Sequence, residues 1–322
     1  MSDAPPDLAA LPPEFLERAH AVLPESVHAE FHRALTDPRP VWARINTLRV
    51  SVEAAREALT ELDPSPGPWP EAVGFRPEQR AEVLRHPLVD AGALYLQSLS
   101  SQSAALALDP QPGEEIVDLC AAPGSKTSHL AARMGEGTLV ANEVSKGRSY
   151  KLRAVLHGLG VLDRAGLDVR VRTGDGVRFR GHVDCFDRVL VDAPCSGDGR
   201  FHVDDPASFA GWSLKKVKAC SSKQKALLHA ALDATRPGGV VVYSTCTLAP
   251  EEDEAVLARA LKRYPHVRLE PLPVDLPGAL PALPKWNGKA LPPSIPEHAR
   301  RLAPGPRWDG FFLARLRVGE AA

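Results

Sequence analysis

The feature that most constrains the fold is an alternation of short apolar runs with longer helical segments in the second half of the chain. Strands are predicted at 115–119, 138–142, 169–173, 186–191 and 240–244. Helices are predicted at 125–134, 145–159, 214–235 and 250–263. Strands that alternate with helices at this spacing form a parallel sheet with helices on both faces. We therefore predict an α/β protein with a doubly wound, mostly parallel sheet.

A smaller α/β unit is predicted to precede this sheet. The segment 44–50 alternates as a strand does, Ser51 has the character of a helix cap, and 72–75 reads as a second strand. We predict a small N-terminal α/β domain over residues 1–85 and a larger domain over residues 86–322, which a helix at 97–108 opens. The proline-rich segment 271–310 is expected to be irregular, and 311–317 is expected to be a final strand.

Composition excludes several classes of protein. The chain of 322 residues is 44 % hydrophobic and 25 % charged, as expected of a soluble globular protein, and no apolar run approaches the ~20 residues that cross a bilayer. No Lys or Arg precedes Arg18, so we expect no secretory signal and a cytoplasmic location. The five cysteines form no C-x-x-C pair, so we expect neither a metal site nor a disulfide framework. Cys120, Cys185 and Cys220 are expected to be small buried residues.

The net charge of −1 conceals a polarity along the chain. Residues 1–117 carry 9 basic and 18 acidic side chains, whereas residues 145–240 carry 17 basic and 10 acidic ones. A near-neutral total therefore does not exclude a nucleic-acid partner, because a local basic surface suffices for phosphate contacts. Ordinary solvated charge explains the same pattern equally well.

A loop of small residues between the first predicted strand and helix suggests a bound cofactor. It contains a single glycine, Gly124, and thus matches neither the phosphate-binding P-loop nor the dinucleotide fingerprint. A ligand without a pyrophosphate, such as S-adenosylmethionine, suits it better. An acidic residue ends or follows each of four predicted strands, which favours a ligand site at their carboxyl ends over turn or capping roles. These acids are Asp118, Glu143 (for ribose hydroxyls), Asp175 (for an adenine edge) and Asp192.

Two cysteines follow predicted neighbouring strands in polar turns, Cys195 in Asp-Ala-Pro-Cys-Ser-Gly and Cys246 in Ser-Thr-Cys-Thr. Both should face the same edge of a parallel sheet. A thiolate that adds to carbon 6 of cytosine makes carbon 5 nucleophilic toward a methyl sulfonium, which is covalent catalysis. Asp192 is placed to serve ring nitrogen 3, and a second thiol suits release of the product. The base must leave its stack to enter such a site.

These motifs resemble the Sun-type RNA 5-methylcytosine methyltransferases, the family of the bacterial RsmB and RsmF enzymes. The resemblance runs from about residue 44 to 317 and is closest at 118–127, 192–197 and 244–247. It implies a Rossmann-like methyltransferase sheet, Cys246 as the nucleophile, Cys195 as the releasing cysteine, and Lys126 reaching the active site, with a solvated helix lysine as the alternative. It implies cofactor contacts from Cys120, Ala121, Ala122, Pro123, Gly124, Ser125, Lys126, Glu143, Arg148, Asp175 and Asp192.

The chain resembles a short RsmF-like form, which favours ribosomal RNA of the small subunit as substrate and a monomer without a membrane partner. The same chemistry on transfer RNA is an alternative, as are a DNA cytosine-5 methyltransferase and a non-catalytic, cofactor-binding assembly factor. The N-terminal domain is expected to help hold RNA. Phosphate contacts are expected from Lys215, Lys216, Lys218, Lys223, Lys225, Arg300, Arg301 and Arg307.

Overall fold

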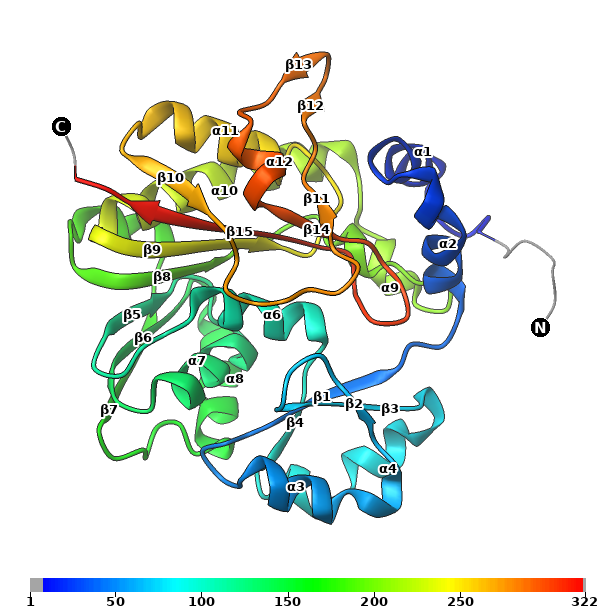
Figure 1. Ribbon diagram of the computed structural model, residues 1–322, viewed down its shortest axis with the longest axis vertical. Coiled ribbons are helices and arrows are strands. Elements are labelled where there is room, and N and C mark those ends of the chain that lie inside the picture. The colour runs from blue at the N-terminus through cyan, green and yellow to red at the C-terminus, as the bar shows by residue number, and fades with distance from the viewer. Residues whose placement is uncertain (1–7, 321–322) are drawn as a thin grey trace.

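The computed structural model of the protein describes residues 8–320. The first seven residues of the predicted N-terminal domain, which belong to the stretch without basic side chains, lie outside the described residues, as do the last two of the larger domain. A large twisted sheet runs through the centre of the molecule, and a smaller sheet lies beneath it (Figure 1).

The central strands of the large sheet are parallel, as the alternating pattern predicted. They lie in the order β7-β6-β5-β8-β9, so the order along the sheet reverses between β5 and β8. Their bounds are Glu115–Asp118 (β5), Gly137–Glu143 (β6), Leu167–Thr173 (β7), Phe186–Asp192 (β8) and Thr235–Thr245 (β9). β15 (Phe311–Val318) extends the sheet antiparallel to β9. Beyond β15 lie β10 (Val267–Glu270), β14 (Arg300–Leu302) and β11 (Leu280–Pro281).

Helices cover both faces of this sheet, and each layer encloses an apolar core (Figure 1). One face carries α6 (Leu99–Leu108), α7 (Ser125–Met134) and α8 (Lys146–Gly158). The other carries α10 (Leu214–Ala234) and α11 (Glu254–Arg263). Serine hydroxyls at Ser98, Ser145 and Ser213 cap α6, α8 and α10, since each accepts a backbone N–H of the first turn. The doubly wound α/β fold is thereby confirmed.

The small sheet is antiparallel, in the order β2-β3-β1-β4. It consists of β1 (Val41–Ile45), β2 (Ser65–Pro66), β3 (Ala72–Phe75) and β4 (Leu94–Leu96), with α3 (Val52–Ala58), α4 (Arg80–Leu84) and α5 (Pro87–Asp90) around it. The division at residue 85 stays a prediction, but the sheet continues past it because β4 pairs with β1.

The first two helices lie apart from the small sheet, beside α9 (Pro206–Phe209) (Figure 1). These are α1 (Pro13–Val22) and α2 (His28–Thr36). They share an apolar cluster with Phe201 and Leu248 of the larger unit. The N-terminal segment therefore packs partly on the larger unit.

Several predicted elements differ in the structure, and β9, for example, begins at Thr235 rather than at residue 240. The first strand ends at Ile45, because Asn46 turns the chain and donates to the carbonyls of Gly92 (2.7 Å) and Leu159 (2.9 Å). The helix predicted from residue 250 begins at Glu254, since the preceding acids form a buried hydrogen-bonded turn. The segment 271–310 is less irregular than expected: it holds β11, β14, the β12–β13 hairpin (Lys285–Trp286, Lys289–Ala290) and α12 (Ser294–His298).

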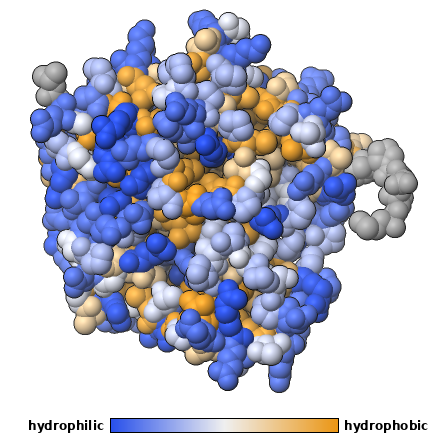
Figure 2. Space-filling view, viewed as in Figure 1, coloured by the Kyte–Doolittle hydropathy of each residue, from blue (hydrophilic) through white to orange (hydrophobic). Residues whose placement is uncertain are grey.

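Hydrophilic residues occupy most of the face shown in Figure 2, and hydrophobic residues appear there in separate small patches. Within residues 8–320, every helix is too short or too polar to cross a membrane.

Candidate active site

A cavity of about 1080 Å³ opens at the carboxyl ends of the parallel strands. Its walls come from the loops after β5, β6, β7, β8 and β9, and from Tyr95 and Gln97 at the junction with the small sheet. It adjoins the reversal of strand order between β5 and β8, where open α/β sheets bind their ligands. The position of the cavity therefore follows from the topology of the sheet.

The loop after β5 forms one wall of this cavity. Cys120, Ala121, Ala122, Pro123, Ser125 and Lys126 line it. Gly124 does not line it: this residue has a φ of +115° and packs against α8, where an added Cβ would lie 3.2 Å from both Leu152 and Val155. Asp118 holds the conformation of this loop, because its carboxylate accepts hydrogen bonds from the Thr127 hydroxyl (2.7 Å) and the Cys120 N–H (3.2 Å). Burial raises the pKa of Asp118 to about 7.

The next two strand-end acids also reach the cavity. Glu143 is buried, accepts the Ser145 N–H (2.9 Å) and lies 3.4 Å from the guanidinium of Arg148, which itself donates to the Ala122 carbonyl (2.7 Å). Asp175 is exposed and accepts the Val177 N–H (3.1 Å), so it caps a turn while lining the cavity. The turn role and the cavity role are thus compatible for this residue.

Asn142 was missed by sequence reasoning. Its buried side-chain amide donates to the carbonyls of Leu119 (3.0 Å) and Gly174 (3.1 Å), and thereby ties together the loops after β5 and β7. A polar residue directly before the strand-end acid was the available signal, because the interior of a parallel strand is otherwise apolar.

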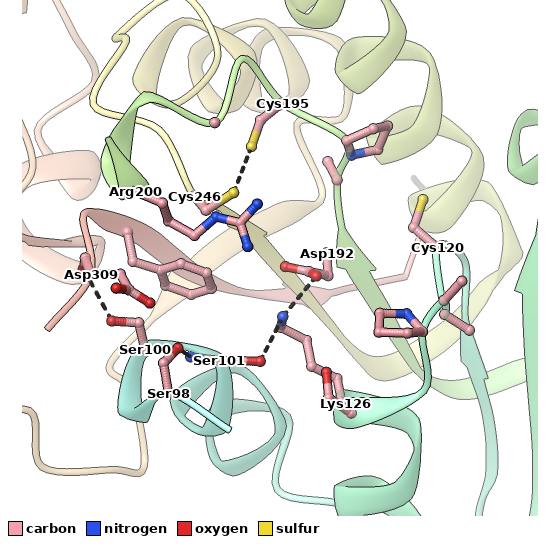
Figure 3. Close-up of a pocket in the computed structure, with 18 of the residues that line it drawn as sticks. Ser98, Ser100, Ser101, Cys120, Lys126, Asp192, Cys195, Arg200, Cys246 and Asp309 are labelled. Carbon is pink, nitrogen blue, oxygen red and sulfur yellow. Dashed lines mark hydrogen bonds and ion pairs between the residues drawn. The ribbon is translucent and has the colours of Figure 1, made fainter. Parts of the chain in front are cut away.

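Cys195 and Cys246 meet in the cavity, with their sulfur atoms 3.1 Å apart (Figure 3). They do so because β8 and β9 are paired parallel neighbours, so their carboxyl ends coincide. The hydrogen bond from Cys195 is the largest cause that lowers the pKa of the Cys246 thiol, and Arg200 adds to it, while burial opposes them. The same hydrogen bond and burial raise the pKa of Cys195 well above its ordinary value. The pair is therefore asymmetric, with the thiolate favoured on Cys246.

Asp192 and Lys126 form an ion pair beside the thiols, with Nζ 2.8 Å from Oδ2 (Figure 3). The ammonium of Lys126 is also 3.0 Å from the Ser101 hydroxyl and lies over the ring of Phe311. The other oxygen of Asp192 accepts the Ser244 hydroxyl (2.9 Å). Lys126 is buried, so the alternative of a solvated helix lysine is wrong.

The buried carboxylate of Asp198 connects the loop that carries Cys195 to the loop that carries Cys246. Asp198 accepts four donors, namely the hydroxyls of Ser196 (3.2 Å) and Thr247 (2.7 Å), the Leu248 N–H (2.7 Å) and the Trp212 indole (3.1 Å). The loops on which Cys195 and Cys246 stand are thus held in one frame. Nothing in the sequence marked Asp198 apart from its place in the loop after Cys195.

Basic side chains of α10 reach the cavity rim. Lys216 and Lys223 line the cavity, and Lys215 and Lys218 are exposed on the same helix. Arg301 was expected on this surface, and that prediction is wrong: it is 1 % exposed and forms a buried ion pair with Glu254. Arg307 is exposed, whereas Arg300 donates to backbone carbonyls near the end of α12.

The remaining cysteines depart from expectation. Cys120, Cys185 and Cys220 are partly exposed rather than fully buried, and all five cysteines of the chain are free thiols. Cys120 and Cys185 do pack against the apolar core beside β8. Cys120 also lines the cavity.

Comparison with known proteins places the chain in a family. Residues 105–317 match the family model described as 16S rRNA methyltransferase RsmB/F. The chain is 35 % identical to ribosomal RNA small subunit methyltransferase F of Serratia proteamaculans over 98 % of its own length and 64 % of that protein. It is 34 % identical to the tRNA (cytosine(49)-C(5))-methyltransferase of Pyrococcus abyssi, over 89 % of this chain and 91 % of that one. The crystal structure of a methyltransferase homologue from Pyrococcus horikoshii superposes with a TM-score of 0.78 at 31 % identity, covering 96 % of this chain and all of that one. This chain therefore belongs to the RsmB/F family of methyltransferases.

Proposed function

We propose that this protein transfers a methyl group from S-adenosylmethionine to carbon 5 of a cytosine in RNA, through a covalent bond between Cys246 and carbon 6. The observation that carries the proposal is the pair of thiols 3.1 Å apart, with an aspartate–lysine ion pair beside it in one cavity. Membership in the RsmB/F family supports it.

In the proposed reaction the Cys246 thiolate adds to carbon 6 of the pyrimidine. Asp192 delivers a proton to ring nitrogen 3 as negative charge develops there, and Lys126, whose ammonium lies 2.8 Å from the Asp192 carboxylate, supplies that proton to Asp192. The addition makes carbon 5 a nucleophile. After methylation a base removes the carbon 5 proton, and the electrons of the C5–H bond restore the C5=C6 bond and expel the Cys246 thiolate. Cys195 remains a thiol beside Cys246, which suits a role in this release.

The cavity has the donors and acceptors that S-adenosylmethionine needs. When bound, this cofactor supplies an electrophilic methyl group. Glu143 offers a buried carboxylate at the end of β6, the position that binds ribose hydroxyls in related sheets. Asp175 offers an exposed carboxylate for an adenine edge, and the small side chains from Cys120 to Ser125 leave room for close approach.

Small-subunit ribosomal RNA is the proposed substrate, because the Serratia relative is named for that activity. The chain spans about two thirds or less of the length of its RsmF-like and Nop2 relatives, so it shares only part of each. Transfer RNA is a second candidate, favoured by the match to nearly the whole of the Pyrococcus abyssi enzyme. The exposed lysines of α10 at the cavity rim are proposed to contact RNA phosphates. A cytoplasmic location, a monomeric state and RNA binding by the N-terminal unit stay predictions.

The test is transfer of label from methyl-tritiated S-adenosylmethionine to four acceptors: small ribosomal subunits, naked ribosomal RNA, transfer RNA and duplex DNA. Label at 5-methylcytosine in one RNA class, absent with Cys246→Ala, is the expected result. Label in DNA would instead indicate the DNA enzyme. Cofactor binding without transfer to any acceptor would indicate the assembly factor.

The roles of the two thiols are tested separately. Cys246→Ala should abolish transfer, and Cys195→Ala should accumulate a covalent protein–RNA adduct that resists denaturation, because the nucleophile adds but is not released. The assigned roles are wrong if Cys246→Ala remains active while Cys195→Ala loses turnover without an adduct.

A further inference from the structure

Two arginines that line the cavity, Arg80 and Arg200, have no side-chain partner among residues 8–320, and Arg200 is the one in the loop that carries Cys195. Arg200 lies at the end of a short 3-10 turn (η5, Asp198–Arg200), and among residues 8–320 its side chain makes neither a hydrogen bond nor an ion pair. The other arginines near the thiols differ. Arg39 binds Asp309 and the Phe201 carbonyl, and Arg148 binds the Ala122 carbonyl. Arg200 therefore presents five free N–H donors to whatever enters the cavity.

The Arg200 guanidinium lines the same cavity as the side chains that are proposed to react with the base. It lies between Cys246 and Asp192 in Figure 3 and points into the cavity. Cys246 is the strongest electrostatic influence on the pKa of Arg200, which it raises, and Asp309, Cys195 and Asp192 act in the same direction. Arg200 thus lines the same cavity as the proposed nucleophile and the aspartate, and a base held by those two groups would enter the space that its guanidinium faces.

The arrangement of donors and acceptors on cytosine determines which edge of the base Arg200 can bind. With carbon 6 at Cys246 and nitrogen 3 at Asp192, one route around the ring passes the O2 carbonyl and the other passes carbon 5 and the exocyclic amine. The second route must stay open for the methyl donor, and its amine is a hydrogen-bond donor. A guanidinium carries donors only, so it complements the O2 carbonyl.

We propose that Arg200 is a catalytic residue that binds O2 of the target cytosine and stabilises the negative charge that enters the ring when Cys246 adds to carbon 6. The electron pair of the thiolate forms the S–C6 bond, and the C5=C6 π electrons move toward carbon 4 and nitrogen 3. The charge is shared through carbon 2 with O2, where the guanidinium lies. The addition step requires no other reactant. Carbon 5 then uses these electrons to bond the methyl group, and the electrons of the C5–H bond restore C5=C6 when the proton is lost and the thiolate leaves.

This inference rests on the proposed function, and the experiment separates the two. Single-turnover methyl transfer is measured at saturating S-adenosylmethionine across a range of RNA concentrations, for wild type, Arg200→Gln and Arg200→Lys. Arg200→Gln should lower the transfer rate at saturating RNA by about 100-fold or more, as loss of one preorganised donor to a developing anion does, with a change in KM for RNA of less than about threefold. The transfer rate of Arg200→Lys should lie between those of wild type and Arg200→Gln, because lysine keeps the positive charge but lacks the planar fork of donors.

A second readout follows the addition step itself. In the Cys195→Ala background, where the adduct is expected to accumulate, Arg200→Gln should slow adduct formation by the same factor as it slows transfer. Cofactor affinity and melting temperature, measured alongside, should match wild type. Arg170→Gln, at an exposed arginine of β7 away from the cavity, is the matched control and should leave both rates unchanged.

Two outcomes overturn the assignment. A loss confined to KM for RNA would make Arg200 a phosphate contact, and an unchanged rate of adduct formation would exclude it from the addition step. If wild type transfers no label to any RNA, the proposed function has failed. Retained transfer in wild type together with an unaffected Arg200→Gln refutes this inference alone.

Discussion

Asp198→Asn should lower the free energy of unfolding by about 2–4 kcal/mol, although it replaces one atom with another of similar size. Two donors converge on each oxygen of this buried carboxylate. Oδ1 accepts from Thr247 and Leu248, and Oδ2 accepts from Ser196 and Trp212. An asparagine keeps one acceptor oxygen and turns the other position into a donor.

The size of the loss follows from which partners can adapt. The hydroxyls of Ser196 and Thr247 can rotate and accept from the new amide, but the Leu248 N–H and the Trp212 indole can only donate. Either orientation of the new side-chain amide therefore leaves one of these two N–H groups facing an NH₂. A buried donor without a partner costs about 1–3 kcal/mol, and exchanging charged for neutral hydrogen bonds at the remaining contacts costs about 1 kcal/mol more.

Urea unfolding followed by circular dichroism measures this loss, with the midpoint shifted and the slope unchanged. The matched control is Asp204→Asn in the same loop, whose side chain is 82 % exposed and which should shift stability by less than about 0.5 kcal/mol. Methyl transfer should fall with Asp198→Asn as well, since both cysteine loops depend on this carboxylate. A destabilisation no larger than that of Asp204→Asn would show that the four hydrogen bonds to Asp198 do not contribute as proposed.

Three further outcomes are expected. Burial raises the pKa of Glu252 from 4.5 to about 7, so the folded state holds this proton more tightly than the unfolded chain, and the contribution of Glu252 to stability falls as pH rises between those values. Glu252→Gln should therefore match wild type near pH 5 in urea unfolding and exceed it by about 2–3 kcal/mol near pH 8; an equal difference at both pH values contradicts this. Because the pKa of Cys246 is lowered and that of Cys195 is raised, iodoacetamide should label Cys246 first and below the pH at which an ordinary thiol reacts, as peptide mass spectrometry can check. Arg301→Met should cost about 3–5 kcal/mol in urea unfolding because it leaves the buried carboxyl groups of Glu254 and Asp253 without their arginine, and Arg301→Met/Glu254→Met should recover the part that Glu254 contributes; no recovery would contradict the pairing with Glu254.

Much of the fold was predictable because each parallel strand is a short apolar run bounded by turn residues. The predicted strand that becomes β8 lies within one residue of its observed bounds, and the serine caps of α8 and α10 mark where those helices start. The errors share a cause. Asn46 ends β1 through contacts with residues distant in sequence, and the acids before Glu254 are drawn into buried hydrogen bonds. Local pattern cannot report partners that lie far along the chain.

The sequence pattern was sufficient to predict which residues stand at the carboxyl ends of the parallel strands, and therefore that Cys195, Cys246 and Asp192 would share one edge of the sheet. This prediction is possible because the extent of each strand and the right-handed crossover between parallel strands follow from local sequence and backbone geometry. Tertiary structure alone decided how these groups are paired. The 3.1 Å sulfur contact and the ion pair of Lys126 with Asp192 depend on side chains from separate elements converging in one cavity. Among residues 8–320, the lack of a partner for the Arg200 side chain is likewise visible only in the tertiary structure. Charge and proton affinity in a buried site are set by such neighbours in space, and neighbours in space are what a linear sequence does not record.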